Sequence, residues 1–197
     1  MPLFDTPFHI VAFVLAIINV LLSILMYALK KRKHILMAKL TNDVVASTQL
    51  GFMFSWTGMV LNIVAIFREI IFYCREKYKF AQSIIWLFVF IILMGVVSPI
   101  ISWQGWISIL PSVGSVLCVI GLYCLKPYIM KIFLLSGSIL WAVYNFLSQN
   151  YIPAIYSIIE VVWATTVLII LLIKYLKNKK ETEKVVKEDE NSEVQNN

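Results

Sequence analysis

The chain has 197 residues, of which 60% are hydrophobic and 14% are charged, and its formal net charge is +6. A water-soluble domain is nearer half apolar and a quarter charged, so this composition excludes a fold solvated mainly by water. The positive charge suggests a nucleic-acid partner at first sight. The basic residues, however, lie in short clusters between apolar runs, where they orient a membrane protein. We therefore expect the lipid bilayer as the partner of most of the chain, and no nucleic acid.

Seven apolar runs are each close to the roughly 20 residues that a membrane-spanning helix needs. The first is too long for the apolar core of a signal peptide, and no small-residue cleavage site follows it, so we expect a retained helix. The fourth contains Pro99 near its end, which neighbouring helices can accommodate within a membrane. The runs cover residues 9–29, 35–54, 59–74, 84–101, 107–125, 129–147 and 152–173.

The basic residues support seven spans and give them a direction. The first and third connections and the segment after the last run hold several Lys or Arg residues and the fifth holds Lys126, whereas the other connections hold none. Lys39, Arg68 and Lys131 lie a few residues inside helix ends on the same side, within reach of snorkelling to the interface. All 17 basic residues then fall on one side, which predicts an outer N-terminus and a cytoplasmic C-terminus. An aromatic belt is expected on the opposite side at Trp56, Trp103, Trp106 and Tyr151.

An internal repeat is indicated by the order of the connections. When the sequence is aligned with itself at an offset of 95 residues, residues of similar chemical type fall on one another, and Asn62 aligns with Ser157. The two halves then point the same way across the membrane, as in parallel repeats. We predict an all-α membrane protein with seven transmembrane helices arranged 3-1-3. Its parts are an N-terminal three-helix bundle (1–79), a linker helix (80–103), a C-terminal three-helix bundle (104–176) and a polar cytoplasmic tail (177–197) that we expect to be disordered beyond a short helical extension.

Two acidic residues stand out within the apolar runs. Asp43 lies about nine residues past the first basic loop, near the midplane, and Glu160 lies in the last run. An uncompensated charge in hydrocarbon costs about 2.5–3.5 kcal/mol, so each must face protein or water, or carry a proton. Both are candidate proton-coupling residues. The alternatives are a structural Asp43 paired with Lys39 one turn earlier, and a protonated Glu160 in an interhelical hydrogen bond. We interpret Arg68 and Glu69 as a positioning pair near the inner end.

Uncharged polar residues mark a candidate solute site. In repeat-built transporters the site lies at the interface of the repeats near mid-membrane. Asn62 lies in the outer half of the third run, and Ser157 and Glu160 are three residues apart, so they share a helix face. Interhelical hydrogen bonding is the alternative role for Asn62. The candidate substrate-binding residues are Asn62, Ser157, Glu160, Gln49, Tyr144 and Asn145.

Three short segments resemble the YgjV-like family of bacterial inner-membrane proteins: the first basic loop through Leu61-Asn62, the motif LPSVGS at 110–115, and the motif WAVYNF at 141–146. The likeness covers about residues 9–175 and implies a bacterial inner (cytoplasmic) membrane location. That family resembles the SWEET, semiSWEET and PQ-loop group, which implies two three-helix bundles joined by a linker helix. In SWEET-type sugar transporters an Asn on the third helix of each bundle lines the pocket. Asn62 fits this pattern, whereas Ser157 and the absence of a Pro-Gln dipeptide depart from it.

Two functions are open at this point. The first is a transporter of a small polar metabolite by alternating access, with proton coupling. The second is a non-transporting membrane scaffold or accessory subunit. No Walker loop, GxGxxG, HExxH or GxSxG motif is present, and the three cysteines have no CxxC spacing. We therefore expect no enzyme activity, no metal site and no cofactor, and we make no prediction of the oligomeric state.

Overall fold

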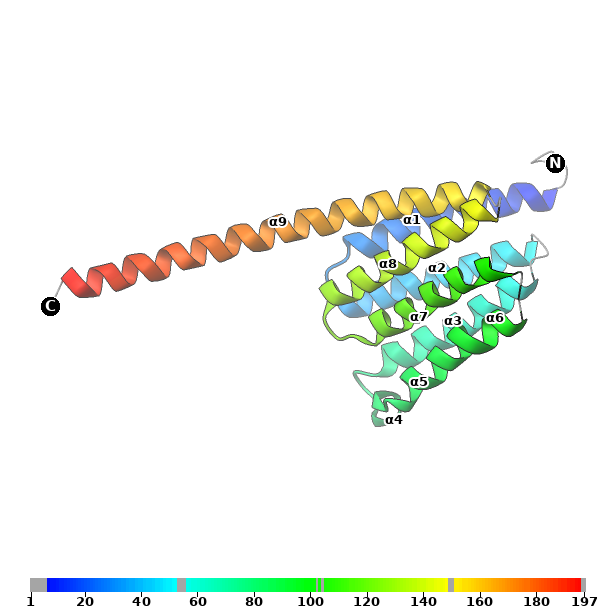
Figure 1. The fold of residues 1–197 in the computed structure, drawn as a ribbon, viewed down its shortest axis with the longest axis horizontal. Helices are drawn as coiled ribbons and strands as arrows, with labels where there is room; N and C mark the ends of the chain where they lie inside the picture. The colour runs from blue at the N-terminus through cyan, green and yellow to red at the C-terminus, as the bar shows by residue number, and fades with distance from the viewer. Residues whose placement is uncertain (1–6, 53–55, 102, 104, 149–150, 196–197) are drawn as a thin grey trace.

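The computed structural model describes residues 7–52, 56–101, 103, 105–148 and 151–195, and within these ranges every regular element is a helix (Figure 1). The all-α class predicted from the sequence is therefore confirmed. The helices are α1 (Pro7–Ala28), α2 (Arg32–Phe52), α3 (Trp56–Cys74), α4 (Lys79–Gln82), α5 (Ile85–Ile92), the π-helical turn η1 (Leu93–Val97), α6 (Ser98–Ile101), the 3-10 turn η2 (Trp106–Ser108), α7 (Ile109–Tyr123), α8 (Pro127–Leu147) and α9 (Tyr151–Gln195).

Four helices are long and apolar enough to cross a membrane by length and composition. The combined segment of α5, η1 and α6 is a shorter apolar helix over Ile85–Ile101. Helices α2 and α3 coincide with predicted spans but carry charged residues in their interiors, and the total of seven spans stays a prediction. The four long apolar stretches are Ile10–Ala28, Trp106–Tyr123, Pro127–Leu147 and Ala154–Asn178.

Apolar side chains cover the outside of the helix assembly. Ile100 and Ile101 in α6 are 71% and 74% exposed, and Leu21 in α1 and Val162 in α9 are also exposed. Soluble proteins seldom expose contiguous apolar patches of this kind. The surface therefore suits lipid as its solvent, in agreement with the composition.

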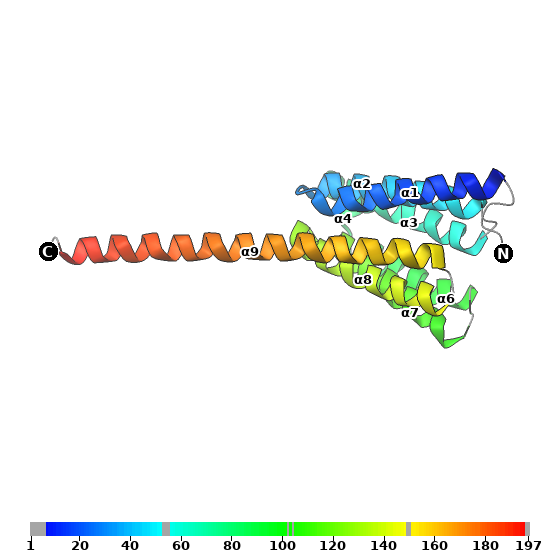
Figure 2. The same ribbon diagram turned by 90° about the horizontal axis from the view of Figure 1, so that it is seen from above.

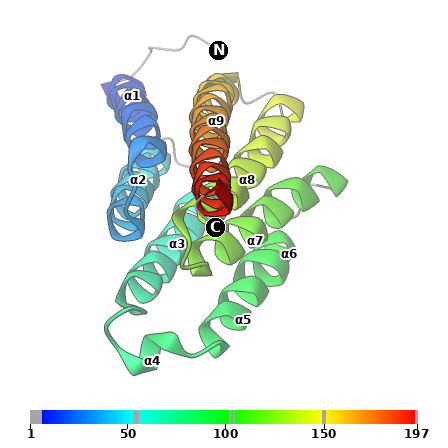
Figure 3. The same cartoon turned by 90° about the vertical axis from the view of Figure 1, so that its left-hand side faces the viewer.

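Six helices form a closed ring in the order α1, α2, α3, α7, α8, α9, in which each packs against the next and α9 returns to α1. Figure 3 looks along α9 from its C-terminal end and shows this order. The segment α5–η1–α6 lies outside the ring against α7. We call α1–α3 the first half and α7–α9 the second half. The halves therefore meet along two seams, α1 with α9 and α3 with α7.

The two halves are closer together at one end of the ring than at the other. Figure 2 shows α1–α3 and α7–α8 converging near the loops that follow α1 and α7, and diverging toward the opposite end. We call the first end the basic end, because Lys30, Lys31 and Lys126 lie in those loops.

The bounds of the helices follow a regular spacing. Helix α2 begins at Arg32 and ends at Phe52, and α8 begins at Pro127 and ends at Leu147, each a shift of 95 residues. The first residues of α3 and α9, Trp56 and Tyr151, are separated by the same 95 residues. This spacing equals the offset at which the sequence superposes similar chemistry.

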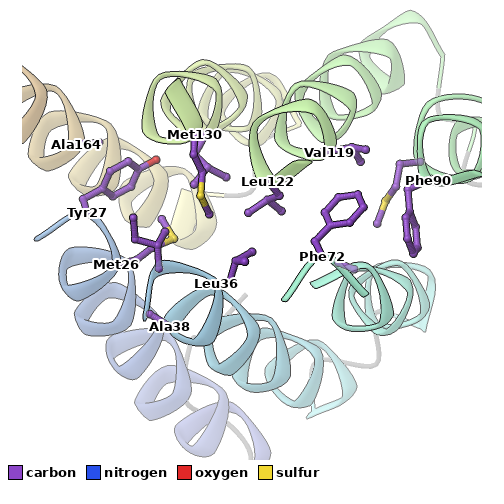
Figure 4. Packing of buried hydrophobic residues seen from close by; sticks show 14 residues of the cluster. Met26, Tyr27, Leu36, Ala38, Phe72, Phe90, Val119, Leu122, Met130 and Ala164 are labelled. Carbon is purple, nitrogen blue, oxygen red and sulfur yellow. The ribbon is translucent and has the colours of Figure 1, made fainter. Parts of the chain in front are cut away.

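The apolar core lies mainly at the basic end. Tyr27, Phe72, Leu122 and Met130 are fully buried, and each lies within about one turn of a helix end there. Figure 4 shows these side chains meeting across the ring. The ring of Phe72 contacts Tyr123 edge-on, with centroids 5.7 Å apart, and thereby joins α3 to α7. Burial of these large side chains contributes to holding the two halves together at this end.

Helix α9 continues to Gln195, into the segment for which the sequence analysis predicted disorder beyond a short helical extension. Ten of the 23 residues that follow Lys174 are Lys or Glu, which have high helix propensity. The sequence prediction considered only that this segment cannot bury a core, and it gave too little weight to these local preferences.

Candidate functional site

A cluster of four charged residues lies between α2 and α3. Lys39 and Asp43, one turn apart on α2, form an ion pair. Arg68 on α3 donates to Glu69 Oε1 at 2.5 Å, and the same nitrogen, Nη2, lies 3.7 Å from Asp43 Oδ2. Asp43, Arg68 and Glu69 are buried. The alternative role of Asp43 as the partner of Lys39 is therefore present in the structure, and Arg68 extends that pair into a network.

The network corrects the expectation that basic side chains snorkel toward the interface. Arg68 and Lys131 are each 3% exposed and point into the protein. Lys131 Nζ donates a hydrogen bond to the Tyr27 carbonyl at 2.6 Å. The reason is that an acidic side chain or a free carbonyl lies within reach, so each charge is satisfied inside the ring. Arg68 and Glu69 are paired, as the sequence analysis expected, and both are buried members of the network.

Several polar atoms of this network have no hydrogen-bond partner among the described residues. They are Asp43 Oδ2, Glu69 Oε2 and Arg68 Nε, each on a side chain that is at least nine-tenths buried. The charges of the two bases and two acids sum to zero, which limits the electrostatic cost of burial. These unpaired donor and acceptor atoms could bind a proton or a water molecule.

Glu160 lies on α9 and is held by hydroxyl groups. Its Oε1 accepts a hydrogen bond from Ser138 Oγ of α8 at 2.7 Å. Tyr156, one turn earlier on α9, interacts with the same carboxyl group, and its hydroxyl lies 2.9 Å from Ser23 Oγ of α1. No ion pair within 4 Å involves Glu160 in the part of the chain that the structure describes. Glu160 is thus a carboxyl group at the seam between the halves that lacks its own cation.

Asn145 and Ser157 lie where α8 packs against α9, and Tyr144 is the neighbour of Asn145 on α8. Asn145 Nδ2 donates to Ser157 Oγ at 3.3 Å, and both side chains are buried. Ser157 is one turn before Glu160, so this pair and the Glu160 group lie along one helix interface. Tyr144 packs edge-on against Trp141, with ring centroids 5.8 Å apart.

Gln49 and Asn62 lie apart from this group. Gln49 Oε1 accepts a hydrogen bond from Asn19 Nδ2 at 2.7 Å, which links α2 to α1 within the first half. Asn62 is half-buried on α3. Among the described residues no hydrogen bond joins Asn62 to its repeat partner Ser157. The structure therefore brings together Ser157, Asn145 and Glu160, and it leaves Gln49 and Asn62 at other positions of the ring.

Ser138, Tyr156 and Ser23 belong to the site although the sequence analysis did not select them. Tyr156 has a detectable signal, because it precedes Glu160 by four residues and therefore shares its helix face. Ser138 and Ser23 have none, because serine is common in membrane helices and only the rotation of α8 and α1 directs these two hydroxyls to the seam.

Two cavities lie away from these residues. One, of about 410 Å³, is apolar and lies between η1, α6 and α7, with Gly95, Pro99 and Val113 in its wall. The other, of about 420 Å³, lies beside α9 at Lys174 and Lys177. Neither is lined by Asn62, Ser157 or Glu160.

The comparisons with known proteins give one match. A family model described as Imp-YgjV, bacterial inner membrane protein, matches residues 10–181. Neither the curated proteins nor the solved structures contain a match. The match confirms the family indicated by the short sequence motifs and places the protein in a bacterial inner membrane. The relation to the SWEET group stays a prediction.

Proposed function

Because the chain belongs to the Imp-YgjV family of bacterial inner membrane proteins, we propose that it transports a small polar solute by alternating access between its two halves. In this proposal α1–α3 and α7–α9 are parallel three-helix bundles, and α5–η1–α6 is the linker span between them. The basic end faces the cytoplasm, with the N-terminus outside. The shift of 95 residues between the bounds of α2 and α8 supports the repeat, and the basic loops support the orientation.

The observation that carries the proposal is the position of Glu160. It lies where the second half meets the first, because its neighbour Tyr156 is hydrogen-bonded to Ser23 across the seam. An ionisable group at such a seam is expensive to place in a membrane and is functional by default. A change in its charge alters the polar contacts between the halves, which is what alternating access requires.

The pattern of ion pairs favours Glu160 over Asp43 as the proton-coupling residue. Lys39 and Arg68 contact Asp43 and Glu69, whereas Glu160 forms no ion pair among the described residues and is held by hydroxyl groups. Deprotonation of Glu160 therefore creates a negative charge with no cation in contact with it. Release of its proton is compensated by a water-filled opening of the seam or by a bound solute. This difference couples proton binding to the conformation of the halves.

We expect Glu160→Gln to abolish the dependence of uptake on a pH gradient, because glutamine keeps the shape and cannot release a proton. Ser138→Ala should lower uptake about tenfold or more, the effect of losing one hydrogen bond to a charged group. The measurement is solute uptake into proteoliposomes across a panel of polar metabolites selected by thermal shift. Ser136→Ala is the matched control, since Ser136 Oγ donates to the Ile132 carbonyl of its own helix.

Asn62→Ala tests the proposed solute site from the first half and should weaken binding of the same solute. If no member of a broad panel is moved or shifts the melting temperature, the transport proposal loses its support. Uptake that keeps its pH-gradient dependence in Glu160→Gln would exclude this residue as the coupling group.

The second candidate is a non-transporting membrane scaffold or accessory subunit. It is favoured by the direct pairing of the central polar groups and by the location of both cavities away from them. A scaffold should co-purify with a stoichiometric partner from mild detergent. It should also keep that partner when Asn62 and Glu160 are replaced, whereas a transporter should lose activity in the same variants.

A further inference from the structure

Arg32 links the first half to the second at the basic end. It is the first residue of α2 and is 5% exposed. Its Nε donates to the Cys124 carbonyl and its Nη2 to the Leu122 carbonyl, each at 3.0 Å. Both carbonyls lie at the C-terminus of α7. An arginine of one half thus binds the helix end of the other half.

Lys131 makes the converse contact from the second half. It lies in the second turn of α8, is 3% exposed, and donates through Nζ to the Tyr27 carbonyl at 2.6 Å. Tyr27 is at the C-terminus of α1. Tyr27 and Leu122 are 95 residues apart, the same shift that relates α2 to α8. The two contacts are therefore reciprocal, with equivalent carbonyls bound by a cation from the opposite half.

Helix C-termini are suited to this role. The last four carbonyls of a helix have no partner within the helix, and the helix dipole makes that end partly negative. The guanidinium of Arg32 also donates to the Phe72 carbonyl at 3.1 Å and to Glu76 at 2.9 Å, so it closes the end of α3 as well. Arg75 adds a further bond across the same seam, to the Tyr123 carbonyl.

The contacts at the opposite end are of a different kind. There the hydrogen bonds between Asn19 and Gln49 and between Asn145 and Ser157 each stay within one half. This difference agrees with the convergence of the ribbons at the basic end and their divergence at the other (Figure 2). The bonds to helix-end carbonyls that span the halves thus lie at the basic end, whereas Ser23 and Tyr156 join α1 to α9 farther along the seam.

We propose that Arg32 and Lys131 form a reciprocal latch that holds the basic end closed, and that both must release the carbonyls of the opposite half before this end opens. The inference rests on the alternating-access function proposed above and names its inner gate. The latch is made from main-chain acceptors, so it depends on the two cations and on the position of the helix ends, and not on an acidic side chain in the opposite half.

The test is a distance measurement across the latch by double electron–electron resonance. Spin labels are placed at Lys31→Cys and Lys126→Cys, both exposed, in a chain whose native cysteines are replaced by serine and which is held in lipid nanodiscs. With the latch intact we expect one short distance distribution. Arg32→Gln combined with Lys131→Gln should broaden it and shift it by about 5 Å to longer distances, the scale of a helix moving by one turn.

Lys33→Gln is the matched control, because Lys33 is exposed and contacts Glu76 of its own half at 3.6 Å. It should leave the distribution unchanged. Lys131→Met keeps the side-chain stem and removes one bond only, so it serves if the double variant fails to elute as a single species. An unshifted distribution in a correctly folded latch variant overturns the inference. The distance measurement is made without solute, so its outcome is separate from the uptake assay. If the distance shifts but no solute is transported, the latch is supported and only the transport proposal fails.

Discussion

Replacing Arg68 by methionine should lower the free energy of unfolding by about 3–5 kcal/mol, the cost of removing one partner from a buried ion pair. Arg68 contacts both Glu69 and Asp43, so its loss leaves two buried carboxylates with Lys39 as the one remaining cation of the network. Methionine keeps most of the side-chain volume, so the effect reports charge and not packing. Reversible unfolding by SDS titration in mixed micelles measures it.

A double variant separates charge imbalance from a loss of shape. Arg68→Met with Glu69→Gln removes one cation and one anion, and it should recover a large part of the lost stability because the network is neutral again. Lys33→Met is the control for removal of a basic residue, and it should cost less than about 1 kcal/mol because Lys33 is largely exposed. Equal losses in Arg68→Met and Lys33→Met would show that the network contributes no special stability.

The second large effect is expected at Gly137, where α8 packs tightly against α7. A Cβ at this position would lie 2.6 Å from Cys118 Sγ and 2.8 Å from the Gly114 carbonyl oxygen. The second contact is with backbone, which cannot move without shifting α7. We expect Gly137→Ala to destabilise the protein by about 1–3 kcal/mol, as overpacking of an interior does. Thermal unfolding followed by size-exclusion chromatography measures it.

Gly51→Ala is the matched control within another helix, α2. Its Cβ would meet the sulfur of Met59 at 3.3 Å, the end region of a flexible side chain. This change should be neutral or slightly stabilising, because alanine has the higher helix propensity. A Gly137→Ala variant as stable as Gly51→Ala would mean that the α7–α8 contact is looser than the structure describes.

The positions of the helices were predictable from the sequence because lipid imposes long apolar runs with charged ends. The run predicted over 129–147 corresponds to α8 at Pro127–Leu147. The start of α2 was predicted three residues late, because a Lys-Arg cluster is ordinarily a solvated loop. Arg32 instead enters the helix, since carbonyls of α3 and α7 are available to bind it.

The pairing of polar side chains was predictable only where it is local. Lys39 and Asp43 are four residues apart on one helix, so their pairing follows from helical geometry. The contact of Ser138 with Glu160 joins two helices, and it depends on how each is rotated about its axis. Apolar runs that face lipid on one side and protein on the other have weak periodicity, so the sequence does not fix that rotation. The sequence therefore suggested which residues are candidates for the solute site, but it could not predict the contacts among them.

Helix α9 is longer than a membrane crossing requires, so small rotations of its membrane part are amplified at its C-terminal end. The helix has 45 residues, which corresponds to about 67 Å at 1.5 Å per residue, while crossing the bilayer takes only about 30 Å. The remaining part projects beyond the basic end (Figure 1). A tilt of about 5° in the segment that carries Glu160 therefore displaces the tip by roughly 3 Å relative to the membrane surface. A label near that tip would report motion of the transmembrane part at a point well clear of the lipid.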